Sequence, residues 1–252
     1  MKIDWIGGFC LALVVCPLAV AQETSLTRAE VAAIKAKLVT VEQAMGADPE
    51  GYLKESEDFS LPTDFNPAQG GKFWPINSSV SLRYTDRASE ESSANAEQAA
   101  KDLQTKYAAA LASGDPNAIL KMTQEMTKIS QLAAAGLSGE AKEDMSVDIG
   151  LNSNSYAGID PDAVVFESPG VIALRDTDLS GEEGRVTVYF DPVALHATET
   201  LSKIELKTPD DGVTNKTGIF NVTINLNGTI ADIESWVKTF DTKAILSVID
   251  SQ

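Results

Sequence analysis

The feature that most constrains the fold is a two-residue alternation of apolar and polar side chains that recurs along the chain. The clearest example spans 220–226 and alternates two sets of residues: Phe220, Val222, Ile224 and Leu226 with Asn221, Thr223 and Asn225. Because successive side chains of a strand point to opposite faces, this pattern predicts a strand with one buried and one wet face. Alternation or short apolar runs recur at 80–84, 145–151, 163–166, 171–174 and 186–190. We therefore expect a mostly antiparallel sheet.

A helical period replaces this alternation between about 89 and 135. Two apolar stripes have steps of three and four residues: Ala96, Ala100, Leu103, Tyr107 and Ala110, then Ile119, Met122, Met126, Ile129 and Ala133. Ser89 is the expected N-cap of the first helix. In the short link at 113–116, Gly114 suits a left-handed C-terminal cap and Pro116 suits the first turn of the second helix. The sequence thus predicts an antiparallel helical hairpin with its stripes, methionines included, in the interface. In the alternative interpretation, the methionine pair forms a pliable binding face.

Helices are also predicted towards both ends. Thr27 and Glu30 have the spacing of a capping box, and an apolar stripe follows over 31–45. Thr229 and Asp232 predict a second capping box near the C-terminus. Asp241 begins a further helix, although the last segment can also be read as a strand.

The segment 47–78 has neither period and contains four prolines and a Gly70-Gly71 pair. It also carries several aromatic residues, namely Tyr52, Phe59, Phe65, Phe73 and Trp74. We expect an irregular loop whose rings pack inward onto the core. In the alternative interpretation, the rings line a groove for a partner or a sugar.

These elements predict an α+β fold: a mostly antiparallel sheet, an antiparallel helical hairpin and additional N- and C-terminal helices. The chain divides into a leader at 1–21, a helix-rich part at 22–142 and a strand-rich part at 143–252. An isolated strand at 80–84 needs a sheet to join, so we expect the two larger parts to pack as one body.

Residues 1–21 have the three parts of a secretory signal. Lys2 supplies the positive start, 6–15 the apolar stretch and 19–21 a small-x-small cleavage site. The apolar run is shorter than a membrane span and contains Pro17, which argues against an anchor. Lipidation of Cys16 is disfavoured because Val15 stands where a small residue is required. We expect cleavage before Gln22 and a periplasmic or secreted protein without a stable membrane span.

Composition excludes several chemistries. Both cysteines, Cys10 and Cys16, lie in the leader, so the processed chain has no thiolate nucleophile, thiolate metal site or redox pair. The net charge of −17 disfavours nucleic acid and anionic lipid as partners. Such charge suits cationic ligands, calcium or simple solubility, and the last of these needs no site.

One acidic segment resembles the start of an EF-hand calcium loop. Oxygen-bearing side chains alternate over 176–182, with Gly181 at the sixth place. The candidate calcium ligands are Asp176, Asp178, Ser180 and Glu182. The twelfth place is occupied by Thr187 instead of a bidentate glutamate, and the flanking segments read as strands. An acidic hairpin turn is the plainer interpretation, so calcium is the one cofactor that we consider.

No catalytic set is predicted. His196 is the only histidine, and the chain has no Gly-x-Ser-x-Gly elbow and no glycine-rich phosphate loop. The acidic pairs Glu182-Glu183 and Asp210-Asp211 lie in turns, whereas a glycosidase needs two acids at a defined separation across a cleft.

The leading hypothesis is an exported, non-enzymatic binding or scaffolding protein of a bacterial envelope. It would bind a protein or a small molecule through the sheet face, the aromatic loop or the helical hairpin. The alternative is an extracytoplasmic hydrolase that uses carboxylates, with or without calcium. A third possibility is an oligomerising envelope component whose hairpin docks another chain, which a contiguous exposed apolar patch on the hairpin would favour.

Overall fold

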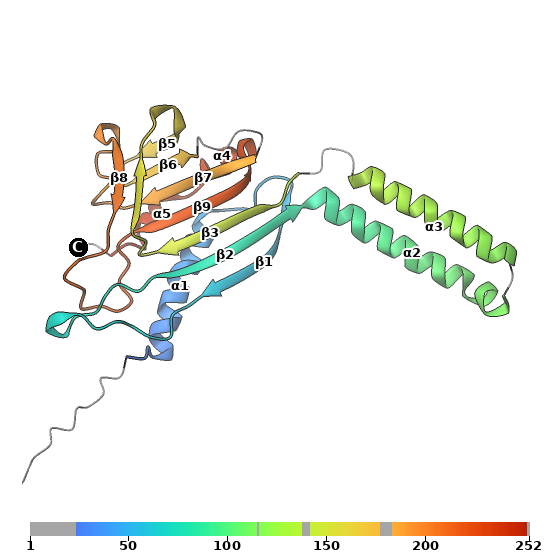
Figure 1. Cartoon of the computed structure of the whole chain (residues 1–252), viewed down its shortest axis with the longest axis horizontal. Coiled ribbons are helices and arrows are strands. Elements are labelled where there is room, and N and C mark those ends of the chain that lie inside the picture. Colours follow the sequence, from blue (N-terminus) through green and yellow to red (C-terminus); the bar gives the residue numbers. More distant parts are fainter. Residues whose placement is uncertain (1–23, 115, 138–141, 177–182, 251–252) are drawn as a thin grey trace, which may run out of the picture.

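A seven-stranded antiparallel sheet forms the centre of the protein in a computed structural model, which describes residues 24–114, 116–137, 142–176 and 183–250 (Figure 1). In spatial order its strands are β1 (Tyr52–Ser60), β2 (Ser78–Asp86), β3 (Met145–Leu151), β9 (Val222–Thr229), β7 (Glu183–Phe190), β6 (Val171–Arg175) and β5 (Val164–Ser168). Every neighbouring pair is antiparallel. The predicted α+β class is confirmed.

One face of this sheet is the apolar face that the alternation predicts. One row of apolar side chains runs across five neighbouring strands, from β2 to β6. Its residues, each paired with the next, are Val80, Ile149, Ile224, Val188 and Ala173. All of them are fully buried. They share one core with residues of α1 (Arg28–Ala44), α4 (Ile230–Val237) and α5 (Thr242–Leu246). The helices from both ends of the chain therefore cover the same face of the sheet.

The opposite face is only partly covered. A second, two-stranded sheet of β4 (Ser155–Gly158) and β8 (Lys203–Leu206) supplies Ile204 and Leu206 to a smaller core. That core also holds Ile172 and Leu174 from β6. Towards β2 and β3 the same face carries exposed polar side chains, among them Ser81, which donates a hydrogen bond to Asp148 across the strands. The sheet thus has one dry face and one half-wet face.

The helices at the two ends are locally specified. The predicted capping box is present: the Glu30 amide donates to Thr27 Oγ1 at 3.2 Å, and the Thr27 amide donates to Glu30 Oε2 at 2.7 Å. Asp241 caps α5 by accepting from the Ala244 amide at 3.0 Å, so the last described segment is helical. The second predicted capping box is wrong, because Thr229 makes no side-chain cap.

The segment 47–78 is more regular than predicted. It contains β1, an edge strand whose central residues 54–58 are exposed on both sides. Of its aromatic rings, Tyr52 and Phe65 are buried and Phe73 packs edge-on against Phe65 at 4.9 Å between ring centroids. Trp74 remains 43% exposed. The segment also contains a short 3-10 turn at Gln69–Gly71, and two more such turns lie elsewhere in the described chain, at Pro161–Ala163 and Thr198–Thr200.

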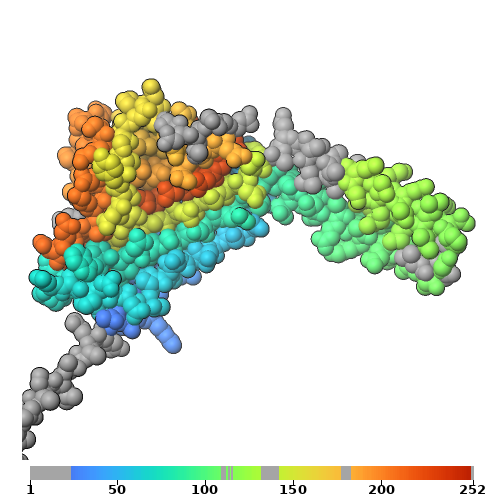
Figure 2. Space-filling view, viewed as in Figure 1, coloured from blue at the N-terminus to red at the C-terminus, as the bar shows by residue number. Residues whose placement is uncertain are grey.

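The predicted hairpin is present as α2 (Arg87–Ser113) and α3 (Pro116–Leu137), inserted between the adjacent strands β2 and β3. We call residues 87–137 the helical arm. It stands away from the sheet, as both the ribbon and the space-filling view show (Figures 1 and 2). The first helix begins directly after β2, and Asp86 rather than Ser89 caps it by accepting from the Ser89 amide at 3.2 Å. The predicted cap at Ser89 is therefore displaced by three residues.

Candidate functional site

The predicted calcium loop is only partly visible. Asp176 follows the end of β6, and its amide donates to the Arg185 carbonyl at 2.9 Å, which places it opposite the start of β7. The other candidate ligands, Asp178, Ser180 and Glu182, lie outside the described residues. Within the described ranges, no group of three histidine, cysteine or acidic side chains could hold a metal ion. The calcium site remains a prediction.

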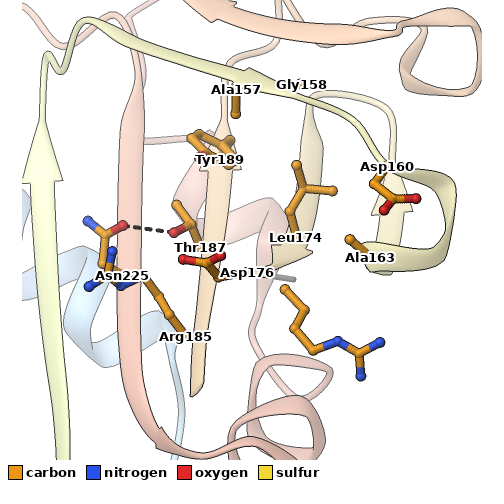
Figure 3. Close-up of a pocket in the computed structure, with 11 residues that line it drawn as sticks. Ala157, Gly158, Asp160, Ala163, Leu174, Asp176, Arg185, Thr187, Tyr189 and Asn225 are labelled. Carbon is orange, nitrogen blue, oxygen red and sulfur yellow. Dashed lines mark hydrogen bonds between the residues drawn. The ribbon is translucent and has the colours of Figure 1, made fainter. Parts of the chain in front are cut away.

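A pocket of about 360 Å³ lies between the half-wet face of the sheet and β4 (Figure 3). Its polar floor is fixed by two hydrogen bonds: Thr187 Oγ1 donates to Asn225 Oδ1 at 2.9 Å, and Arg185 Nε donates to Asn227 Oδ1 at 2.8 Å. The remaining lining comes from β4, β6, β7 and the turns beside them, namely Ala157, Gly158, Asp160, Ala163, Leu174, Arg175, Asp176 and Tyr189.

The charged groups of this pocket are balanced in sign, with two arginines and two aspartates in its lining. Arg175 pairs with Glu234 at 3.2 Å, and Asp160 accepts from the Asp162 amide at 3.0 Å. Burial raises the pKa of Tyr189, so its hydroxyl stays protonated at neutral pH. The described lining therefore offers polar walls, but no nucleophile held against a base.

The sequence-level candidates for acid–base chemistry lie apart from this pocket. His196 is exposed, and its Nδ1 donates to the Val193 carbonyl at 2.9 Å. Asp210 and Asp211 are both exposed. One carboxyl pair was missed: a hydrogen bond shared with Glu183 raises the pKa of Glu143. The two residues are distant in sequence and meet only because β3 and β7 flank β9, so no local pattern could have revealed the pair.

The helical arm presents the most unusual surface of the described molecule. Leu103 is its one buried hydrophobic residue among the side chains that the structure describes. By contrast, Ile119, Leu120 and Met126 of α3 are 42%, 59% and 37% exposed. Scattered exposed apolar residues are common on proteins, but Ile119 and Met126 are seven residues apart and share one side of the helix, whereas Leu120 lies about 100° round the helix from Ile119.

The root of the arm is fixed to the body by a small polar network. The Arg87 amide donates to the Gly51 carbonyl at 2.9 Å, and its guanidinium donates to the Tyr52 carbonyl at 3.3 Å. On the returning side, Lys142 pairs with Asp232 at 3.1 Å. Tyr52 donates to the same carboxylate at 3.1 Å. Both ends of the arm are thus held near the start of β1, and sequence reasoning did not predict this clamp.

An α+β body with a two-helix arm inserted between neighbouring strands is the class that the fold defines. Comparisons of the chain with known protein families, with curated proteins and with solved structures found no match. In the part of the chain that the structure describes, no helix is long and apolar enough to cross a membrane. The function must therefore be argued from the surface itself.

Proposed function

We propose that this chain is an exported, non-enzymatic scaffolding protein of a bacterial envelope, and that its helical arm docks another protein chain. One observation carries the proposal. The arm projects from the body and exposes Ile119 and Met126 on one side of α3, while Leu103 is the only buried hydrophobic residue among its described side chains. Contiguous apolar surface on a projecting element is typical of a protein-interaction site.

The energetics of the arm point in the same direction. Two antiparallel helices with one buried leucine between their described side chains gain little from their own packing, and most helical stability in proteins comes from packing of an apolar face. A partner on the exposed side would remove more apolar area from water, worth about 25 cal/mol for each Å². Binding would therefore stabilise the arm as well as the complex.

Export rests on the leader at 1–21, with its positive start, apolar stretch and small-x-small site. The acidic body is consistent with a protein that remains soluble after export. N-terminal mass spectrometry of the protein from its own cells tests this part. A chain that begins at Met1 and fractionates with the cytosol would contradict it.

Docking is tested with a photo-crosslinking amino acid placed at Met126 in cells that make the protein. The matched control carries the same amino acid at Lys128, which is on the opposite flank of α3. We expect covalent protein adducts from position 126 and none from position 128. If neither position gives an adduct, or if both give the same adducts, the arm is not a docking element.

A further inference from the structure

We propose that the partner of the arm is a second copy of this chain, and that two arms pack face to face in opposite directions as a four-helix bundle. This inference rests on the proposed function of the arm and names its partner. Four observations carry it: the distribution of net charge, the uncharged flank of α3, the internal hydrogen bonds of two threonines of that helix, and the size of the surface.

Charge is distributed unevenly between the arm and the rest of the chain. Residues 87–137 contain five basic and six acidic residues, so the arm contributes −1 to the net charge of −17 and the remainder carries −16. Two bodies of such charge repel each other, whereas two arms do not. Pairing in opposite directions places the bodies at opposite ends of the bundle, and it is therefore the arrangement with the least repulsion.

One flank of α3 carries no charge. On α3, Lys121, Glu125 and Lys128 follow each other at steps of four and three and so share one flank. Lys106 of α2 pairs with Glu125 at 3.1 Å, which shows that this charged flank lies on the same side of both helices. The other flank of α3 carries Ile119, Thr123, Met126 and Ser130, none of which is charged.

The matching flank of α2 carries the small or uncharged residues Ser93, Ala96, Ala100 and Gln104, with Glu97 beside them in an ion pair with Lys101 at 2.6 Å. Ala96 and Ala100 are only half-buried, so they are open to a further neighbour. Short side chains allow helices to approach closely, while the larger Ile119 and Met126 fill space beside them.

Two threonine hydroxyls of α3 are satisfied within the helix: that of Thr123 on the uncharged flank and that of Thr127 one turn further on. Thr123 Oγ1 donates to the Ile119 carbonyl at 3.0 Å, and Thr127 Oγ1 donates to the Thr123 carbonyl at 2.9 Å. A hydroxyl that already has a partner can be buried without the cost of an unmade hydrogen bond. This side of the arm can therefore be covered by a second helix pair.

The surface is large enough for a stable dimer. The 22 residues of α3 give a length of about 33 Å, and two adjacent helices give a width of about 20 Å. Each arm then offers about 660 Å², and the pair buries about 1,300 Å², which is within the standard range for specific interfaces. Met126 lies at the middle of α3. A two-fold axis at its level brings Met126 close to its own copy.

The first test measures the mass of the purified protein by sedimentation or light scattering. We expect twice the mass of one chain for the wild type and the mass of one chain for Met126→Glu. Two-fold symmetry places two glutamates in the interface for each substitution. We therefore expect the dissociation constant of the dimer to rise about 100-fold or more. The matched control is Leu120→Glu, which introduces the same acid on the back of α3 and should leave the dimer intact.

The second test does not depend on a disruptive variant. Met126→Cys should form a disulfide-linked dimer under mild oxidation, whereas Lys128→Cys should not, and far-UV circular dichroism checks that the arm remains helical. A wild type of single-chain mass overturns the inference, as does a Leu120→Glu variant that dissociates like Met126→Glu. If the wild type is a monomer but the photo-probe at Met126 captures a different protein in cells, the docking function stands and self-association fails.

Discussion

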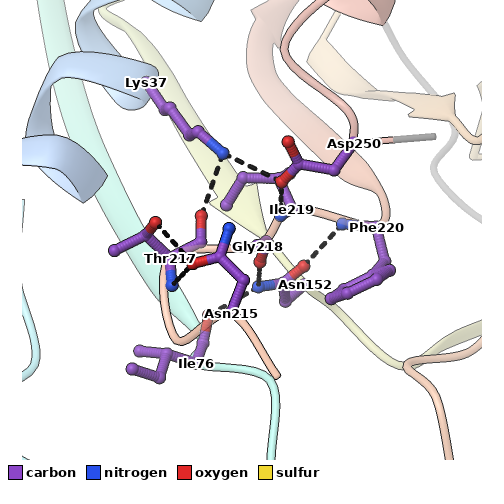
Figure 4. Close-up of polar contacts among 9 residues, drawn as sticks. All are labelled: Lys37, Ile76, Asn152, Asn215, Thr217, Gly218, Ile219, Phe220 and Asp250. Carbon is purple, nitrogen blue, oxygen red and sulfur yellow. Dashed lines mark hydrogen bonds and ion pairs between the residues drawn. The ribbon is translucent and has the colours of Figure 1, made fainter. Parts of the chain in front are cut away.

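Asn152 should be among the most sensitive positions for the stability of the body. It directly follows β3, is 4% exposed and adopts a left-handed backbone with φ of 58°. Its side chain joins segments that are distant in sequence (Figure 4). Nδ2 donates to the carbonyls of Ile76 at 2.8 Å and Gly218 at 2.9 Å, and Oδ1 accepts from the Phe220 amide at 2.8 Å.

The expected cost of Asn152→Ala follows from these contacts. Three backbone groups lose their partner, at about 1 kcal/mol for each hydrogen bond. Alanine also tolerates the left-handed backbone less well than asparagine, by about 1 kcal/mol. We therefore expect the free energy of unfolding to fall by about 4 kcal/mol. Asn152→Gly removes the same hydrogen bonds without the backbone penalty, so it should cost about 1 kcal/mol less than alanine.

Equilibrium unfolding in urea, followed by tryptophan fluorescence and circular dichroism, measures these differences when the two probes coincide. Asn77→Ala is the control, because Asn77 is exposed and close to the same segment, and it should change stability by less than about 0.5 kcal/mol. A loss below about 1 kcal/mol for Asn152→Ala would refute the reasoning. A glycine variant that is less stable than the alanine variant would refute the backbone argument.

Three further outcomes are expected. Burial raises the pKa of Tyr52 from 10.0 to about 12 and also raises the pKa values of Tyr84 and Tyr189, so the folded state keeps these protons longer than the unfolded state. The free energy of unfolding should be unaffected by these groups below pH 10 and should fall as the pH rises from 10 towards 12. An absorbance titration in which all tyrosines of the folded protein ionise together would contradict this expectation. Gly212→Ala should lower the melting temperature more than Gly70→Ala. Both glycines have positive φ, but only a Cβ at 212 would lie 2.7 Å from the Ala68 Cβ. Equal effects would show that the loop moves to relieve this close contact. Calcium should leave the melting temperature unchanged, whereas an increase that Asp178→Asn abolishes would establish the calcium loop instead.

The parts of the fold that were predicted correctly are those with a local cause. The alternation at 220–226 needs only the geometry of a strand, and Thr27 and Glu30 need only one helical turn to meet. Edge strand β1 was missed because its central residues 54–58 are exposed on both faces, so no alternation marks them. Charged edges of this kind discourage pairing with other chains, and this same property conceals the strand in the sequence.

The misplaced caps have a non-local cause. Thr229 and Asp232 have the right spacing, but Asp232 instead accepts from Tyr52 and pairs with Lys142, residues from two distant segments. Ser89 has the right residue type, but β2 runs directly into α2 and Asp86 already satisfies the Ser89 amide. In both cases, several residues have the type and spacing of a helix cap, and the surrounding structure decides which of them forms it.

The candidate docking side of the arm is also a feature that the local sequence pattern could not predict. Helical periodicity predicts Ile119 and Met126 as part of an apolar stripe, but it does not specify what covers that stripe. In a helix that lies on the sheet, the stripe would be core. Here α2 begins where β2 ends and leads away from the sheet, so α3 lies beside α2 and not on the sheet (Figure 1). One helix can cover only part of the stripe, and Ile119 and Met126 remain 42% and 37% exposed. The insertion point therefore turns residues with a core pattern into a surface, and only a partner can complete their burial.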